Sequence, residues 1–118
     1  MNINEKSKEE QLDIVEQFPE LIKNIDNPSE ELQLAIVKIH GINIMYCNKP
    51  SKKVQLAAVE NYGCSLGSIK CIPDDEVKLA AVTQCGYAIY YIENPTQEMI
   101  TAAVNNRKDA GRFVKNYV

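Results

Sequence analysis

Four cysteines are the side chains of this chain best suited to nucleophilic chemistry or metal binding. They are Cys47, Cys64, Cys71 and Cys85, and no two of them have the C-x-x-C spacing that is typical of zinc sites. In stacked helices, neighbouring axes lie about 8–10 Å apart, which is wider than the ~7 Å Cα separation that a disulfide tolerates. We therefore expect four reduced thiols that fill small apolar spaces, with no metal site and no cofactor.

Enzymatic catalysis by a nucleophile would need a base beside it, and His40 is the only histidine available. It directly precedes Gly41 at the predicted end of a helix, where a cationic or hydrogen-bonding side chain is favourable. The acidic residues mark helix starts and exposed faces, and they do not form a facing general acid and base. No glycine-rich phosphate-binding loop is present in the sequence. The sequence thus predicts a protein that is not an enzyme and has no catalytic residues.

Aromatic side chains offer the best candidates for binding, because Tyr, Met and Arg are enriched in protein interfaces. Met45-Tyr46, Tyr90-Tyr91 and Arg112-Phe113 stand at equivalent places in a repeated unit, so that in a helical array they would line one surface, with a small gap at Gly67 and Ser68. Tyr62 and Tyr87 flank glycines that recur in the same unit. We predict that a protein partner binds Met45, Tyr46, Tyr62, Tyr87, Tyr90, Tyr91 and Arg112. The alternative is that the tyrosines pack between units and expose only their hydroxyls.

A sequence unit that returns about every 22 residues must position these side chains. Its best copies begin at Pro28, Pro50, Pro73 and Pro95, which stand 22, 23 and 22 residues apart. A fixed period of this size is typical of stacked helical units. We predict an all-α fold, a short α-solenoid of about five helix-turn-helix units that forms a single domain over residues 1–118. The units are placed at residues 6–26, 27–48, 49–71, 72–93 and 94–118.

The first half of each unit is predicted to form a long helix. Val54, Ala57 and Ala58 show the i, i+3, i+4 spacing of a helix that buries one face, and the other copies match them. Proline is tolerated in the first helical turn, because its missing N–H would be unpaired there. Asn27 and Asn94 directly precede a proline and are the candidate N-caps.

A glycine marks the predicted end of the long helix. Gly41, Gly63 and Gly86 occupy the same place in three copies, and we expect each to close its helix in the left-handed conformation. A two-turn helix of about seven residues should follow. The first and last copies depart from this pattern, since Pro19 and Lys108 stand at the glycine position.

The two ends of the predicted array differ in polarity. The first copy carries acidic residues on its outer face, as an end cap requires. The last copy finishes with apolar side chains, and no capping unit follows them in this sequence. We predict self-association as a homodimer through Phe113, Val114, Tyr117 and Val118.

Composition and charge bound the kinds of partner. Sixteen acidic and 13 basic residues give a net charge of −3, and 45% of the residues are hydrophobic, which suffices for a core. Nucleic-acid-binding domains usually carry a clustered basic excess, so the acidic balance argues against such a partner. No apolar run approaches the length of a membrane span, and the first ten residues are too polar for a signal peptide. We expect a cytoplasmic protein that does not bind membranes.

The sequence N-P-S-E-E-L-Q-L-A-I-V at residues 27–37, followed by Gly41 and a short apolar helix, resembles a family of short helical-pair repeats. Units of that family read like N-P-S-E-x-V-Q-L-A-A-V and then G-x-A-I, and the resemblance covers roughly residues 27–104. The family occurs in bacterial, phage and large-virus proteins and is known mainly as a domain of unknown function. The resemblance implies an all-helical repeat and no functional residues.

The sequence therefore leaves three functions open. The first is a non-enzymatic protein-interaction module. The second, suggested by phage members of the family, is a phage-encoded inhibitor that resembles anti-CRISPR proteins and binds a host defence protein directly. The third is a helical repeat that binds nucleic acid, since some helical repeats read RNA one base per unit.

Overall fold

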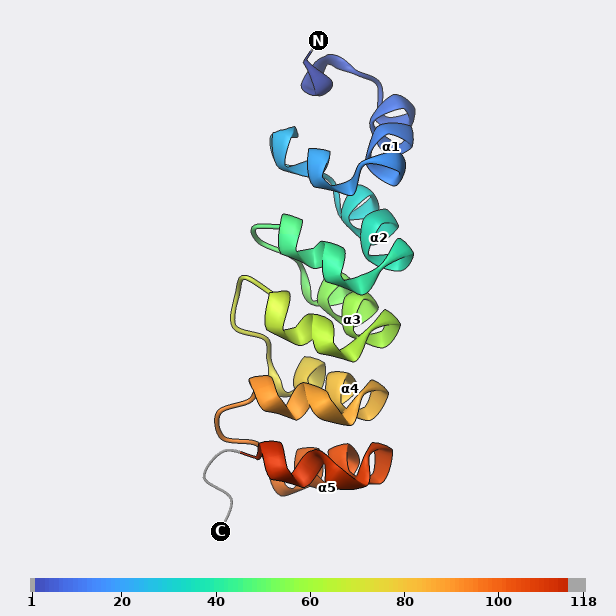
Figure 1. Cartoon of the computed structure of the whole chain (residues 1–118). Helices are drawn as coiled ribbons and strands as arrows, with labels where there is room; N and C mark the ends of the chain where they lie inside the picture. The colour runs from blue at the N-terminus through green and yellow to red at the C-terminus, as the bar shows by residue number, and fades with distance from the viewer. Residues whose placement is uncertain (1, 115–118) are drawn as a thin grey trace.

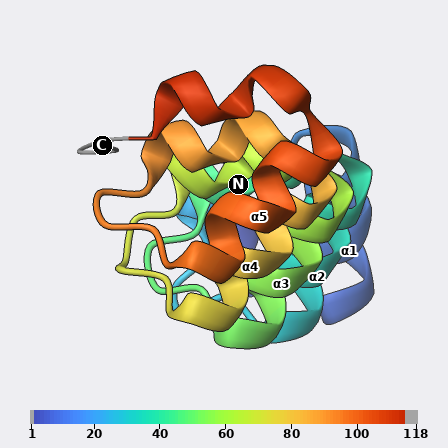
Figure 2. The same ribbon diagram turned by 90° about the horizontal axis from the view of Figure 1, so that it is seen from below.

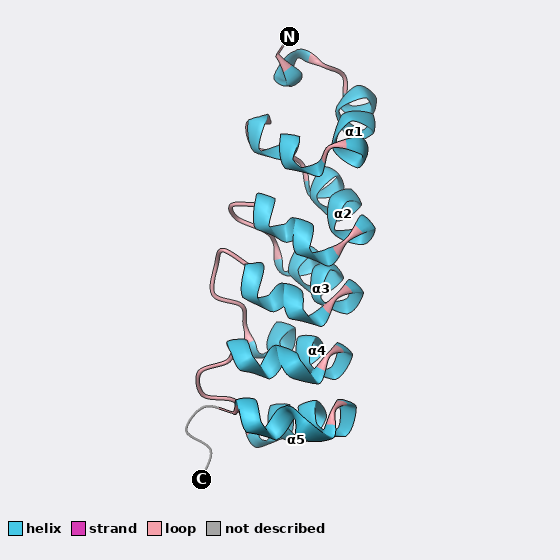
Figure 3. Cartoon of the chain, viewed as in Figure 1, coloured by secondary structure: helices cyan, strands magenta, loops and turns pink. Residues whose placement is uncertain are grey.

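The computed structural model describes residues 2–114, and this part of the chain is helical without strands, so the all-α prediction is confirmed there. Ten-residue α-helices alternate with 3-10 helices (Figures 1 and 3), which have six residues each except the three-residue η1. The α-helices are α1 (Lys8–Gln17), α2 (Glu30–Ile39), α3 (Lys52–Asn61), α4 (Asp75–Gln84) and α5 (Gln97–Asn106). The 3-10 helices are η1 (Ile3–Glu5), η2 (Pro19–Asn24), η3 (Gly41–Tyr46), η4 (Gly63–Ser68), η5 (Gly86–Tyr91) and η6 (Lys108–Phe113).

The helices pack in chain order. Each α-helix contacts the next α-helix, and each of η2 to η6 contacts the α-helix before it and its neighbouring 3-10 helices. Seen along the long axis, the two kinds of helix form two rows (Figure 2). The described residues extend over 55 × 20 × 17 Å, and their Cα radius of gyration is 15.8 Å. A compact globule of this length would have a radius of gyration of about 13.5 Å. The molecule is therefore elongated along the direction in which the helices follow one another.

The core lies between the two rows and consists of two clusters that meet at α3. Val54 and Ala58 belong to the cluster on the α1 and α2 side, whereas Val59 belongs to the cluster on the α4 and α5 side. All three side chains are fully buried. A helix that buries two of its sides must lie between two neighbours, which is the arrangement that α3 adopts.

The α-helices begin differently from the prediction. The N-cap is the residue after the proline, and its side-chain oxygen accepts a hydrogen bond from the backbone N–H three residues later. These N-caps are Ser29, Ser51, Asp74 and Thr96. The assignment of Asn27 and Asn94 as caps was therefore wrong, because the proline precedes the cap and does not enter the first turn. Asn27 instead turns the chain with a positive φ of 49°.

The proposed role of the glycines was also wrong. All five glycines lie in the described part of the chain, and none has a positive φ. Each of α2 to α4 ends at an extended residue, and Gly41, Gly63 and Gly86 then open the next 3-10 helix. A Cβ on Gly63 would overlap the carbonyl oxygen of Ala81 in the following α-helix. Gly41 and Gly86 meet Ala58 and Ala103 in the same way. Glycine is required by the close approach of two backbones, and not by a left-handed turn.

An amide side chain from the following α-helix completes each of these contacts, and we call the three bonds the amide clamps. The N–H groups of Gly41, Gly63 and Gly86 donate to side-chain oxygens of Asn61, Gln84 and Asn106 at 2.6, 2.5 and 2.7 Å. Asn61 and Asn106 also donate to backbone carbonyls of the preceding α-helix, so these two clamps are two-sided. In the first copy the clamp is missing, because Pro19 has no N–H and Ile39 stands in the place of the amide.

Candidate partner-binding surface

Four aromatic rings gather at the C-terminal end of the row of 3-10 helices. Tyr87, Tyr90 and Tyr91 come from η5, and Phe113 comes from η6. Their rings meet edge to face, with centroid distances of 5.7 Å for Tyr87–Phe113, 5.3 Å for Tyr90–Tyr91 and 6.1 Å for Tyr90–Phe113. Tyr90 and Tyr91 nevertheless remain 53% and 48% exposed. Large aromatic surfaces of this kind contribute strongly to binding when a partner covers them.

These rings surround a hollow of about 490 Å³, which we call the tyrosine hollow. Its lining is completed by Cys64 from η4 and Arg112 from η6. A hollow of this volume falls within the range of about 300–1,000 Å³ that is typical of small-molecule sites, and it is wide enough to admit a side chain of a partner.

Charged groups border the tyrosine hollow. The guanidinium of Arg112 lies 5.1 Å from the centroid of Phe113, and that of Arg107 lies 5.4 Å from the centroid of Tyr87. The hydroxyl of Tyr87 donates to the carboxylate oxygens of Asp109 at 2.9 and 3.1 Å. This hydrogen bond, together with desolvation and the negative charge of Asp109, raises the pKa of Tyr87. The rim therefore presents cations held by cation–π contacts and a tyrosine fixed by an acid.

Tyr91 fills the gap that the sequence suggested at Gly67 and Ser68. A Cβ on Gly67 would lie only 2.5 to 2.7 Å from three atoms of the Tyr91 ring. The ring thus covers the backbone of the preceding 3-10 helix, and it can do so only because residue 67 has no side chain. The predicted gap in the aromatic row is therefore occupied by the ring of Tyr91.

The structure brings together four of the seven residues predicted to bind a partner, namely Tyr87, Tyr90, Tyr91 and Arg112. The other three lie elsewhere. Tyr46 lines a different hollow, of about 480 Å³, where the ammonium of Lys23 lies 5.4 Å from its ring centroid. Met45, on η3, is 44% exposed. The predicted row is therefore divided among separate parts of the surface.

Tyr62 is the third of these residues, and it lies at the end of α3. Its ring meets His40 edge to face at a centroid distance of 5.4 Å. It lines a hollow of about 430 Å³ together with Cys85 and Arg107. His40 itself accepts a hydrogen bond at Nδ1 from the N–H of Ile42 at 3.2 Å, so its imidazole caps η3.

Two residues of the tyrosine hollow were assigned other roles from the sequence. Phe113 was predicted, with Val114, to mediate self-association, and both are half-buried against the core. Cys64 was predicted to be a packing residue. Tyr117 and Val118, the other members of the predicted self-association set, lie outside the described residues. Cys64 and Tyr87 stand at equivalent places in successive copies. This equivalence could have predicted that η4 contributes Cys64 to the same site as Tyr87.

Two thiols also lie closer together than expected. The sulfur atoms of Cys64 and Cys85 are 3.5 Å apart, although all four thiols are free, as the sequence predicts. The distance between the axes of neighbouring helices does not limit their approach, because neither residue lies inside an α-helix. Burial, followed by the hydrogen bond with Cys85, raises the pKa of Cys64 to about 11. Burial also raises the pKa of the Cys47 thiol to about 11.

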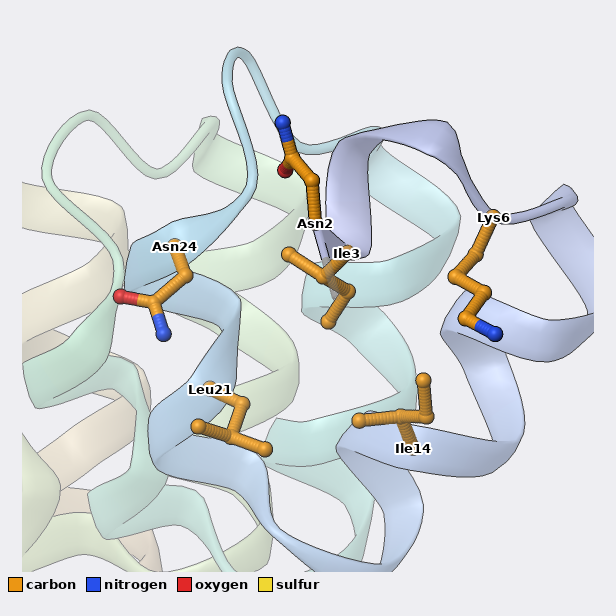
Figure 4. A pocket seen from close by; sticks show the side chains of 6 residues that line it. All are labelled: Asn2, Ile3, Lys6, Ile14, Leu21 and Asn24. Atoms are coloured by element: carbon orange, nitrogen blue, oxygen red, sulfur yellow. The ribbon is translucent and has the colours of Figure 1, made fainter.

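A separate hollow of about 380 Å³ lies at the N-terminal end, where η1 folds over α1 and η2. Ile3, Ile14 and Leu21 point into it (Figure 4). Asn4 ties η1 to this end, because its side-chain amide donates to the carbonyl of Asn24 at 3.2 Å. The lining of this N-terminal hollow is aliphatic and polar, without the aromatic rings and arginine of the tyrosine hollow. We interpret η1 as a cover over this end of the molecule and the tyrosine hollow as the candidate site.

In comparisons with models of protein families, with curated proteins and with solved structures, nothing matches this chain. Within residues 2–114, no three His, Cys, Asp or Glu side chains are grouped so that they could hold a metal ion. The described helices include none with the length and apolar character needed to cross a bilayer. The case for a function therefore depends on the geometry of the surface.

Proposed function

We propose that this chain is a non-enzymatic protein-interaction module, and that its partner inserts a side chain into the tyrosine hollow. The observation that carries the proposal is the hollow itself, in which Tyr90 and Tyr91 stay half exposed around a volume of about 490 Å³. Tyrosine and arginine are the residues that most often dominate binding energy at interfaces. Here both surround one concave site at one end of the row of 3-10 helices.

We also propose that the scaffold is an α-solenoid of five stacked units. The packing of successive α-helices in chain order and the three amide clamps between copies support this architecture. A solenoid needs each unit to contact only its neighbours. Small-angle X-ray scattering should give a radius of gyration near the Cα value of 15.8 Å. A value near the ~13.5 Å of a compact globule would argue against the solenoid.

Charge favours a protein over a nucleic acid as the partner. The net charge of the chain is −3, and the acidic Asp109 accepts a hydrogen bond from Tyr87, which lines the tyrosine hollow. A single-stranded nucleic acid would be expected to follow a continuous positive groove past stacking aromatic rings. Aromatic stacking is available here, but the charge pattern does not repeat along the molecule.

The test is an affinity capture from the native cell with matched variants. The double variant Tyr90→Ala/Arg112→Ala removes one exposed ring and one cation from the hollow. We expect it to lose the partner that the natural chain captures, with affinity about 30-fold weaker, because hot-spot truncations cost about 2 kcal/mol or more. Gly67→Ala tests the same surface without removing a side chain, since its methyl group must displace the ring of Tyr91.

The control is Ile72→Ala, which truncates an apolar side chain that is 92% exposed outside the tyrosine hollow. It should capture the partner like the natural chain. Equal capture by the double variant would refute the proposal. So would tight binding of a single-stranded oligonucleotide that weakens steeply with salt. A captured nuclease or defence protein of a bacterial host would favour the inhibitor alternative within the same binding mode.

A further inference from the structure

Cys64 and Cys85 form a pair of facing thiols between two successive copies. Cys64 is the second residue of η4, and Cys85 is the residue at which α4 ends. Their sulfur atoms lie 3.5 Å apart. The other two cysteines have different surroundings, since Cys47 is buried and the sulfur of Cys71 accepts a hydrogen bond from Gln55 at 3.3 Å.

The stacking of the copies creates this contact. One copy later, the same two places are occupied by Tyr87 and Arg107, which also touch, with the guanidinium 5.4 Å from the ring centroid. The second residue of a 3-10 helix is therefore brought against the end of the next α-helix in both cases. Gly63 allows the approach at the cysteines, because a Cβ there would lie 2.9 Å from the Cβ of Cys85.

A disulfide between the two residues needs only a small movement. Its S–S bond is about 2.05 Å long, so the sulfur atoms must approach by about 1.5 Å from their present 3.5 Å. Both residues are only partly buried, so a small oxidant can reach them. Burial raises the pKa of Cys64 to about 11, so this thiol is mostly protonated at neutral pH and reacts with peroxide through a small thiolate fraction.

We propose that Cys64 and Cys85 are a redox-active dithiol pair, which hydrogen peroxide oxidises to a reversible disulfide. One thiolate attacks an oxygen of the peroxide, the O–O bond breaks, and the cysteine becomes a sulfenic acid while the leaving hydroxide takes up a proton as water. The second thiolate attacks the sulfenic sulfur, forms the S–S bond and expels hydroxide, which also leaves as water. The two thiols supply the two electrons and the two protons, and an added dithiol reduces the bond again.

Oxidation would join η4 covalently to the end of α4. The link would also lie between two surface features, because Cys64 lines the tyrosine hollow and Cys85 lines the hollow that contains Tyr62. This redox proposal is independent of the proposed binding function, because it is based on the distance between the two sulfur atoms.

The experiment treats the reduced full chain with hydrogen peroxide and then alkylates the remaining thiols under denaturing conditions. We expect the intact mass to show loss of two of the four thiols. Peptide mapping should show a Cys64–Cys85 cross-link, and dithiothreitol should restore all four thiols. At the same peroxide dose, Cys64→Ser and Cys85→Ser should each keep their three remaining thiols.

Cys71→Ser is the matched control, because Cys71 is also partly buried but its sulfur faces an amide. It should still lose two thiols to the cross-link. Equal loss of thiols in the natural chain and in Cys85→Ser would overturn the proposal. A mapped bond to Cys47 or Cys71, or a bond between two molecules, would overturn it as well. The mapping is made on the natural chain, so it remains decisive if a variant fails to fold.

Discussion

At the scale of single residues, the glycines that open the 3-10 helices stabilise the molecule by letting two backbones touch. Gly86 lies so close to the carbonyl oxygen of Ala103 that any Cβ would overlap it. The clash could not be relieved by a side-chain movement, because the two nearest atoms are the backbone carbonyl oxygen and carbon of Ala103. Gly111, in contrast, faces only a methyl group of Val104 at 3.8 Å, which is an ordinary van der Waals contact.

Gly86→Ala should therefore destabilise the protein, whereas Gly111→Ala should not. Overpacking of this kind costs about 1–3 kcal/mol or more, and urea denaturation followed by circular dichroism will measure it. Gly111→Ala is the matched control, and it should be neutral or stabilise by up to about 1 kcal/mol through the unfolded chain. Equal stabilities of the two variants would show that the close backbone approach at Gly86 is absent.

The amide clamps make a second prediction. Asn106 accepts from the N–H of Gly86 at 2.7 Å and donates to the carbonyl of Thr83 at 3.3 Å. Asn106→Ala leaves the N–H of Gly86, a buried residue, without its acceptor, and we expect a loss of about 1–3 kcal/mol. Asn105→Ala, one residue earlier and exposed, should change stability by less than about 0.5 kcal/mol. A similar loss in both variants would mean that helix propensity, and not the clamp, was measured.

The sequence predicts where glycines recur but not what they do. Their spacing relative to the prolines is visible in the chain, whereas the carbonyl that each one meets lies 17 or 18 residues away, in the next copy. The glycine at residue 41 was consequently assigned a local role, as a left-handed helix end, although Gly41 serves a contact with Ala58. Local signals cannot distinguish these two uses of glycine.

At the scale of elements, the caps decide where helices begin. In α2 to α5 the residue directly after the proline is the N-cap, and its hydroxyl or carboxylate oxygen accepts from a free N–H of the first turn. The helical spacing of the apolar residues predicted α2 to α5 well, because that periodicity is local. The short helices were predicted as two α-helical turns, and they are 3-10 helices of six residues, since so few residues show the same apolar pattern in either geometry.

Asp74 makes the start of α4 sensitive to pH. Its carboxylate accepts from the N–H of Val77 at 3.1 Å and lies 3.2 Å from the ammonium of Lys52. The hydrogen bond to Val77, followed by the one to Lys52, lowers the pKa of Asp74 below its ordinary value of 3.8. The unfolded chain therefore binds this proton at a higher pH than the folded chain does.

The contribution of Asp74 to stability should be fully present above its unfolded pKa and should be lost as pH falls through the lower folded pKa. Asp74→Ser keeps a capping side chain without the charge. We expect the free energy of unfolding to fall more steeply between about pH 5 and pH 2 in the natural chain than in Asp74→Ser. Urea titrations at stepped pH will measure both slopes. Identical slopes would contradict a titrating cap.

At the scale of the whole molecule, the site is less predictable than the fold. Tyr90 and Tyr91 were singled out by their equivalent places in the repeated unit and Tyr87 by its position beside a glycine, and the structure places all three on η5. The hollow, however, arises from the ring of Phe113 in the next copy and from the absence of a side chain at Gly67. Volume and exposure depend on such contacts between copies, and a list of equivalent positions does not contain them.

Self-association remains a prediction at this scale. Phe113 and Val114 are half-buried near the end of the described chain, and Lys108 carries a side chain where three copies have glycine. A dimer contact there must therefore differ from the contact between successive copies. Sedimentation velocity should show a mass that rises toward a dimer with concentration, and Val114→Lys should keep the chain monomeric. A natural chain that stays monomeric at millimolar concentration would rule out the dimer.

The missing clamp between Pro19 and Ile39 leaves the contact between α1 and the rest of the molecule without the bond that the three other contacts have. In the proposed solenoid each unit is stabilised by its neighbours, so thermal opening should start where the clamp is missing and release α1 before any other helix. The helix at the opposite end, α5, is held by Asn106 and provides the comparison. In hydrogen–deuterium exchange, the amides of α1 should exchange well before those of α5, and Pro19→Gly with Ile39→Asn should slow them. Unfolding would then begin at the N-terminal end of the molecule and not at the C-terminal end.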